Sequence, residues 1–261
     1  MEHPDSNPED LNSSIWVFGY GSLCWHPGFD YDKSTTGYVK GYTRKFWQGN
    51  DQHRGTRDNP GRVATLVQEP ESIVWGRAFL VSGKSAVPYL HTREGTLGGY
   101  KTSFEQFYPK DHSDQSSSSE DGLSETSQPI RTMMFIACPT NSMWLGEAPL
   151  HEIANQIVSC KGPSGHNAEY VLRLAIFMRE NIPDAHVHDP ELFTLEIMIR
   201  SRLKEKKIPL HVIMGEEAPS DSTSNASSSY QDDLDVRPVS RRSFDFTARL
   251  PNKNLRCVNI N

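Results

Sequence analysis

The spacing of apolar and polar residues predicts a chain that begins with β-strands and continues with helices. Short apolar or alternating runs that lie between turn-rich clusters are typical of strands. In the first half these runs predict strands over Ile15–Phe18, Tyr38–Trp47, Val63–Val67, Ile73–Val81, Phe104–Tyr108 and Met133–Cys138. A single short helix, Ser85–Arg93, is predicted among them, with Ser85 as its N-cap.

In the second half the period changes to that of an α-helix. Apolar residues recur at i, i+3, i+4, i+7 and i+8 in Leu150, Ile153, Ala154, Ile157 and Val158. Asn167 is suited to cap a second helix, and Asp189-Pro190 is the preferred cap-then-proline start of a third. Strands followed by helices predict an α+β domain in which helices flank a curved or barrel-like sheet.

Three polar segments divide the chain. The segments Asp111–Gln128 and Pro219–Asp235 are rich in Ser and Asp, and the first dozen residues are similarly polar. Such segments bury too little apolar surface to offset the entropy of ordering. We therefore expect a flexible N-terminal tail over 1–14, a single domain over 15–210 and a flexible C-terminal tail over 216–261. The Ser-rich part, 111–129, joins two predicted strands, so it is expected to be an insertion within the domain.

Composition narrows the class of protein. The net charge of −6 argues against a general nucleic-acid binder. No run of 18 apolar residues is present, so no membrane span is expected, and the acidic N-terminus is unlike a targeting peptide. The four cysteines form no C-x-x-C pair, which indicates neither a structural zinc site nor a thioredoxin-like site. We expect a cytosolic protein in which these cysteines are free thiols.

The stretch "VFGYGSLCW", Val17–Trp25, places two glycines around Tyr20 at the end of the first predicted strand. Glycine tolerates positive φ and carries no Cβ, so the backbone N–H groups of such a turn can converge on an anion or a developing oxyanion. A dinucleotide fingerprint would need a glycine in place of Cys24 and then a helix, and the sequence provides neither. A serine nucleophile elbow would need glycines two residues on either side of Ser22, where Tyr20 and Cys24 stand instead. A plain tight turn stays open as an alternative.

Glu94 lies at the predicted C-terminal end of the short helix, just before a glycine-rich stretch. The helix dipole disfavours a carboxylate there, and partial burial would raise its pKa further. Such a group is suited to act as a general base near neutral pH. A solvated surface glutamate is the alternative that this single residue leaves open.

Several motifs in order resemble the ChaC-type glutathione-specific γ-glutamylcyclotransferases, from about Ile15 to about Leu203. They are "VFGYGSLCW", "RKFWQGNDQHRGTRDNPGRVATLV", "VWGRAFLV", "TRE" with "GGY", "YPKD", "WLGEAPLHEIANQIVSCKGPSGHNAEYV" and "DPELFTLEIMIRSRL". The resemblance implies a γ-glutamylcyclotransferase-like mixed β-barrel flanked by helices. It also implies that glutathione is converted to 5-oxoproline and cysteinylglycine without a cofactor or metal; it does not indicate the oligomeric state.

The resemblance also implies roles for individual residues. Glu94 matches the glutamate that serves as general acid and base, and the substrate loop matches Gly19, Tyr20, Gly21, Ser22, Leu23 and Cys24. Tyr170 is expected near the substrate, with a core aromatic as the alternative. Arg54 is a candidate for binding a substrate carboxylate, with a surface arginine as the alternative.

One departure from the family pattern concerns the loop after Glu94. Gly95, Thr96 and Leu97 separate Arg-Glu from Gly-Gly, where the family usually has one residue. A misplaced carboxylate lowers the rate steeply. A family member that binds γ-glutamyl peptides or a protein partner without turnover is therefore an alternative, as is the same chemistry on another γ-glutamyl substrate.

Overall fold

The computed structural model describes residues 14–82, 100–110 and 128–215. All of them belong to one compact unit, Met1–Ala218. The predicted helix Ser85–Arg93, Glu94, the C-terminal tail and nearly all of the N-terminal tail and the Ser-rich insertion lie outside the described residues. The domain boundaries therefore stay predictions.

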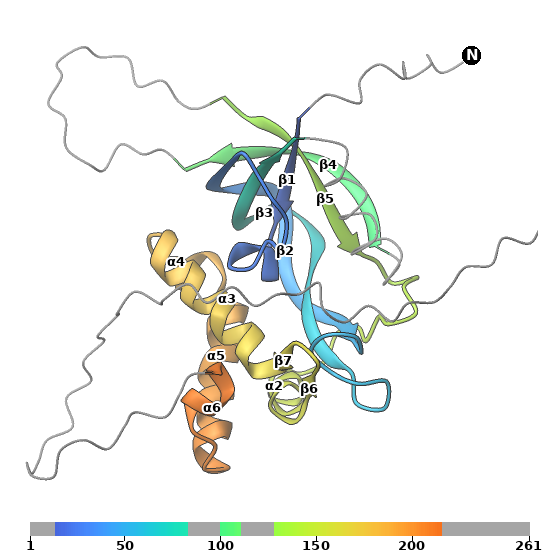
Figure 1. Cartoon of the computed structure of the whole chain (residues 1–261), viewed down its shortest axis with the longest axis vertical. Helices are drawn as coiled ribbons and strands as arrows, with labels where there is room; N and C mark the ends of the chain where they lie inside the picture. Colours follow the sequence, from blue (N-terminus) through green and yellow to red (C-terminus); the bar gives the residue numbers. More distant parts are fainter. Residues whose placement is uncertain (1–13, 83–99, 111–127, 216–261) are drawn as a thin grey trace, which may run out of the picture. The chain divides into compact units, whose positions relative to one another are not determined.

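Five strands form a closed barrel in the order β1-β3-β2-β4-β5 (Figure 1). The strands are β1 Ile15–Gly19, β2 Lys33–Asn50, β3 Gly61–Val81, β4 Tyr100–Pro109 and β5 Ile130–Ala137. Neighbouring strands are antiparallel except β1 and β5, which pair in parallel and close the barrel. Because β1 and β5 run in the same direction, their carboxyl ends, Gly19 and Ala137, lie at the same end of the barrel.

The third strand differs from the prediction. The two strands predicted over Val63–Val67 and Ile73–Val81 are parts of one strand, β3, which pairs with β2 along nearly its whole length. Lys40 pairs with Ile73 and Tyr42 with Gln68, so β3 carries extra residues at a bulge. The extra residues include three exposed ones, Glu69, Pro70 and Glu71, which interrupt the apolar pattern and made one bent strand look like two.

The second half forms helices α2 Leu150–Ser159, α3 Asn167–Asn181, α4 Ala185–His188, α5 Pro190–Glu205 and α6 Leu210–Met214. A two-stranded sheet, β6 Lys161–Gly162 and β7 Gly165–His166, precedes α3. Apolar side chains of α2, α3 and α5 share one hydrophobic core cluster with barrel residues such as Phe18, Phe46 and Phe107. This shared core explains why the helices flank the barrel, and it confirms the predicted α+β architecture.

The helix starts test the predicted caps. Asp189 caps α5 as predicted, because its Oδ1 accepts a hydrogen bond from the Leu192 N–H at 3.1 Å. Asn167 is not the cap of α3; His166 is, and its ring Nδ1 accepts from the Ala168 N–H. The buried Asn167 side chain instead binds both backbone groups of Arg62, accepting from its N–H and donating to its carbonyl. A contact with a distant strand therefore decides the role of this asparagine.

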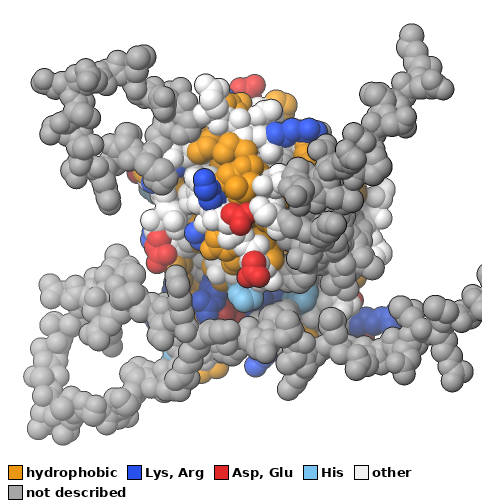
Figure 2. Space-filling view, turned by 45° about the horizontal axis from the view of Figure 1, so that its top comes forward, with side chains coloured by type: hydrophobic (Ala, Val, Ile, Leu, Met, Phe, Trp, Pro, Cys, Tyr) orange, Lys and Arg blue, Asp and Glu red, His pale blue; other side chains and the backbone are white. Residues whose placement is uncertain are grey.

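The surface carries both signs of charge. On the face shown in Figure 2, Lys, Arg, Asp and Glu side chains are interspersed among hydrophobic ones.

Within the ranges that the structure describes, every helix is too short or too polar to cross a bilayer.

Candidate active site at the end of the first strand

The turn that contains Gly19 and Gly21 is tightly packed against neighbouring side chains. β1 ends at Gly19, and the 3-10 helix η2, Ser22–Cys24, follows at once, with the Cys24 N–H donating to the Gly21 carbonyl at 3.0 Å. Neither Gly19 nor Gly21 has a positive φ. A Cβ on Gly19 would lie 2.4 Å from Leu23 Cβ, and one on Gly21 would lie 2.6 Å from Tyr170 Oη. Lack of space, and not a left-handed backbone, is therefore what requires glycine here.

Tyr170 brings helix α3 to this turn. Its hydroxyl oxygen accepts a hydrogen bond from the Ala64 N–H at 3.2 Å and lies against Gly21, and its ring packs edge-on against Trp25. Burial raises the pKa of the Tyr170 hydroxyl to about 12. The hydroxyl is therefore neutral at physiological pH and keeps a proton that it can donate. The structure thus brings together Tyr170 and the predicted substrate loop, two features that the sequence indicated separately.

Most side chains of the predicted loop point inward. The Tyr20 hydroxyl donates to the Phe135 carbonyl at 2.5 Å, Cys24 Sγ donates to the Gly19 carbonyl at 3.3 Å, and Leu23 belongs to a buried apolar cluster. Gly19 is buried as well, whereas Gly21 and Ser22 are partly exposed. A ligand at this turn can therefore meet Gly21, Ser22 and the backbone, while the other side chains hold the turn in shape.

The buried thiol of Cys24 gives a direct test of this arrangement. Burial raises the pKa of Cys24 from 9.0 to about 12, which lowers its thiolate fraction at pH 8 by about 1000-fold. We expect iodoacetamide at pH 8 to modify the partly exposed Cys138 and to leave Cys24 unmodified, as read by peptide mass spectrometry. In denaturant both should react. Equal labelling of the two thiols in the native protein would contradict the buried turn.

Arg54, which lies between β2 and β3 in the sequence, contacts the start of α3 and is already paired. Its Nη1 donates to Glu169 Oε2 at 2.6 Å and to the His166 carbonyl at 3.1 Å, and the side chain is 11% exposed. Glu169 also pairs with Arg173 at 2.7 Å. Arg54 is thus neither an unpaired surface arginine nor an open fork, and its proposed contact with a substrate carboxylate stays a prediction.

Sequence reasoning missed Arg44, which lies directly behind the turn. Arg44 is 2% exposed, and its Nε donates to the Tyr20 carbonyl at 3.0 Å. Its other guanidinium nitrogens contact the Asp189 carboxylate and the Trp75 carbonyl. A signal was present: in β2, Tyr42, Arg44 and Phe46 alternate on the buried face, and a charged residue at such a position needs buried partners.

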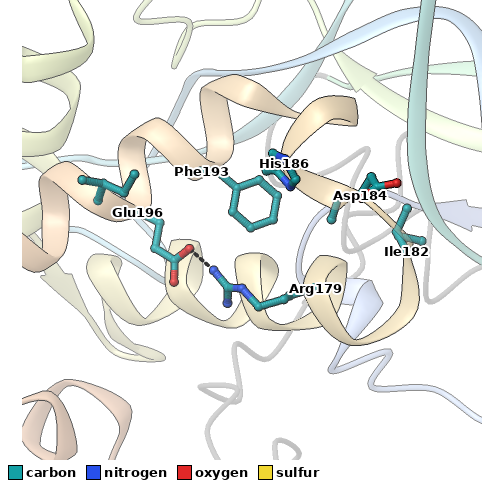
Figure 3. Close-up of a pocket in the computed structure, with 8 residues that line it drawn as sticks. Arg179, Ile182, Asp184, His186, Phe193 and Glu196 are labelled. Atoms are coloured by element: carbon teal, nitrogen blue, oxygen red, sulfur yellow. Dashed lines mark hydrogen bonds and ion pairs between the residues drawn. The ribbon is translucent and has the colours of Figure 1, made fainter. Parts of the chain in front are cut away.

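A hollow of about 350 Å³ lies elsewhere, between α3, α4 and α5 (Figure 3). Its polar side chains include Arg179 and Glu196, which form an ion pair at 2.5 Å. None of the predicted site residues within the described ranges lines it. Its lining residues are Arg179, Ile182, Asp184, Ala185, His186, Phe193, Glu196 and Ile197. In the described ranges, no three His, Cys, Asp or Glu side chains are arranged to hold a metal ion.

A family model described as "ChaC-like protein" matches residues 15–202. The chain belongs to the ChaC-like family. This ChaC-like chain is 44% identical over 203 residues to glutathione-specific γ-glutamylcyclotransferase 1 of Danio rerio, a match that covers 76% of this chain and 96% of the relative. It is 45% identical over 184 residues to the Homo sapiens protein of the same name, covering 69% and 75% of the two chains.

The ChaC-like chain also matches a solved structure. The crystal structure of a γ-glutamyl cyclotransferase specific to glutathione from yeast superposes with a TM-score of 0.62 at 25% identity, covering 73% of this chain and 97% of that one. The likeness confirms the predicted γ-glutamylcyclotransferase-like barrel. At one end of that barrel, Gly21 of the turn lies against the Tyr170 hydroxyl, which is neutral.

Proposed function

We propose that this ChaC-like protein is a glutathione-specific γ-glutamylcyclotransferase. The observation that carries the proposal is the 44% identity, over nearly the whole length of the relative, to a protein of that name. In the reaction, the α-amine of the γ-glutamyl group attacks its own γ-carbonyl carbon. The bond from that carbon to the cysteinyl nitrogen breaks, the nitrogen takes a proton, and 5-oxoproline and cysteinylglycine leave. Atoms balance without water or a redox partner.

The turn supports this chemistry because it offers donors for the charge that develops. The γ-carbonyl oxygen becomes an oxyanion when the amine attacks, and preorganised donors stabilise it most. The Gly21 N–H lies at the partly exposed part of the turn, and no described residue accepts its hydrogen bond. The Tyr170 hydroxyl lies against the same glycine and stays protonated. We assign these two groups to the oxyanion, with Ser22 at the edge of the site.

Glu94 is the proposed general base and acid. The α-ammonium has no free electron pair, so a base must first take a proton, which the cysteinyl nitrogen later receives. The strand that follows Glu94 in the sequence, β4, begins at Tyr100, which pairs with Ala137. The Ala137 carbonyl accepts from the Thr65 hydroxyl at 3.0 Å, one residue from the Ala64 N–H that donates to Tyr170. The chain therefore enters β4 at the end of the barrel that carries the turn.

The same proposal includes a cytosolic location and a reaction that needs no cofactor. The ring closure needs proton transfer and a bent substrate conformer, which protein side chains supply. Cys24, Cys138 and Cys160 are free thiols among the described residues, which suits a cytosolic protein in a compartment where glutathione keeps thiols reduced.

The proposal is tested by incubating the full-length purified chain with glutathione. We expect 5-oxoproline and cysteinylglycine to appear in equal amounts as glutathione is consumed, measured by liquid chromatography and mass spectrometry. γ-Glutamyl amino acids that lack the glycine should be poor substrates and weak competitors. Tight glutathione binding without product would instead identify a non-catalytic binder, and equal turnover of the shorter compounds would identify a broader γ-glutamyl specificity.

A further inference from the structure

Arg44 is held by three parts of the fold at once. Its guanidinium contacts the Tyr20 carbonyl after β1, the Trp75 carbonyl of β3 and the Asp189 carboxylate at the start of α5. Asp189 is itself fixed, because its other oxygen caps α5 through the Leu192 N–H. Arginine suits this place because its planar fork presents several donors in a rigid arrangement. The side chain therefore has little freedom to move.

The bond to the Tyr20 carbonyl determines where the next N–H points. No cis peptide occurs among the described residues, so the peptide between Tyr20 and Gly21 is trans and planar. In such a peptide the C=O and the N–H point in opposite directions. Because Arg44 binds the Tyr20 carbonyl from the buried side, the Gly21 N–H is directed away from Arg44, and no described residue accepts it.

We propose that Arg44 is a positioning residue that directs the Gly21 N–H toward the γ-carbonyl oxygen of the substrate, an inference that rests on the proposed function. Arg44 does not touch the substrate. Its hydrogen bond prevents the Tyr20–Gly21 peptide from rotating, so the donor is in place before the reaction begins. A cation bound to the carbonyl also polarises the peptide, which makes the N–H at its other end a stronger donor.

The surroundings of Arg44 agree with this role. Its charge acts on both Cys24 of the turn and Tyr170, where it opposes the rise in pKa that burial causes. The only carboxylate bound to Arg44 among the described residues is that of Asp189, at the start of α5. Arg44 thus contributes positive potential beneath the place where the oxyanion forms.

The test is the variant Arg44→Lys, which keeps the charge for Asp189 but cannot donate to all three acceptors with the same geometry. We expect kcat for glutathione to fall roughly 10- to 50-fold while KM changes less than about threefold, because an aimed donor acts on the transition state. The matched control is Arg62→Lys. Arg62 is also buried and donates to Gln156 and to the Phe46 and Gly146 carbonyls, none of which belongs to the turn.

Arg62→Lys should lose thermal stability and keep kcat within about threefold. An equal loss of kcat in both variants, or an unchanged kcat in Arg44→Lys, would overturn the positioning role while leaving the proposed function intact. A wild-type chain without turnover would instead refute the proposed function.

A second measurement needs no variant to fold. In the ¹⁵N-labelled full-length wild-type protein, we expect the Gly21 amide resonance to shift when 5-oxoproline, which carries the product carbonyl, is added. If Arg44→Lys folds, the shift should be much smaller in that variant. A Gly21 amide resonance that does not shift in the wild type would overturn the inference. A shift in a wild-type protein that shows no turnover would support the inference and refute the proposed function.

Discussion

Replacing Glu94 by Gln is expected to lower kcat for glutathione by about 1000-fold with an unchanged thermal unfolding temperature. A positioned general base contributes roughly 10²- to 10⁴-fold, and an amide of the same shape cannot take the proton from the α-ammonium. The measurement is the steady-state rate of 5-oxoproline formation with circular dichroism as the check of folding. The matched control, Glu71→Gln, removes one exposed carboxylate on β3 and should keep the wild-type rate.

The pH dependence distinguishes loss of a base from a general defect. The α-amine of glutathione lies beside a carboxylate, so its pKa is above the value of about 8 for a peptide N-terminus, and the substrate loses its proton unaided as pH rises toward that pKa. Below that pKa, the ratio of the wild-type rate to the Glu94→Gln rate should therefore fall by up to about tenfold for each unit of increase in pH. The wild-type rate itself should stay nearly level. A deficit that is constant with pH would assign Glu94 a structural role, and normal turnover at pH 7 would remove it from the mechanism.

The fold was predictable where local pattern and burial agree. The apolar stripe of α2 is buried, and the proline after Asp189 begins α5, because both follow from one stretch of chain. The division of β3 into two strands was wrong because the bulge between Gln68 and Ile73 places polar residues in the middle of a paired strand. The cap of α3 was wrong because Asn167 binds a strand that sequence proximity does not reveal.

The candidate site was predictable only in part, for the same reason. Two glycines around a tyrosine indicate a special turn, but only the structure shows that Tyr170 is the group that requires Gly21 to lack a side chain. Alternation with Tyr42 and Phe46 places Arg44 on the buried face of its strand, but the sequence does not show that Arg44 pairs with Asp189 or that Arg54 pairs with Glu169. Which acceptors surround an arginine depends on the packing of distant elements.

The variant Gly21→Ala is expected to lower kcat by about 100- to 1000-fold. The new Cβ would lie 2.6 Å from Tyr170 Oη, and the Tyr170 ring is buried against Trp25 with its hydroxyl bonded to the Ala64 N–H, so it cannot move aside cheaply. The turn must shift instead, and the Gly21 N–H loses its aim at the oxyanion. Loss of one such donor costs this much in other enzymes.

A double variant identifies the cause of that loss, with 5-oxoproline formation again as the measurement. Tyr170→Phe removes the hydroxyl that the new methyl would meet, and the next nearest atom, Tyr170 Cζ, lies at 3.7 Å, an ordinary contact. Tyr170→Phe alone should be impaired because it lacks a proposed donor and leaves the Ala64 N–H unpaired. Adding Gly21→Ala to Tyr170→Phe should cost less than about threefold relative to Tyr170→Phe alone, because the clash is gone and the turn keeps its place. A double variant much slower than Tyr170→Phe alone would mean that the methyl group obstructs the substrate directly and that contact with Tyr170 is not what requires glycine at this position.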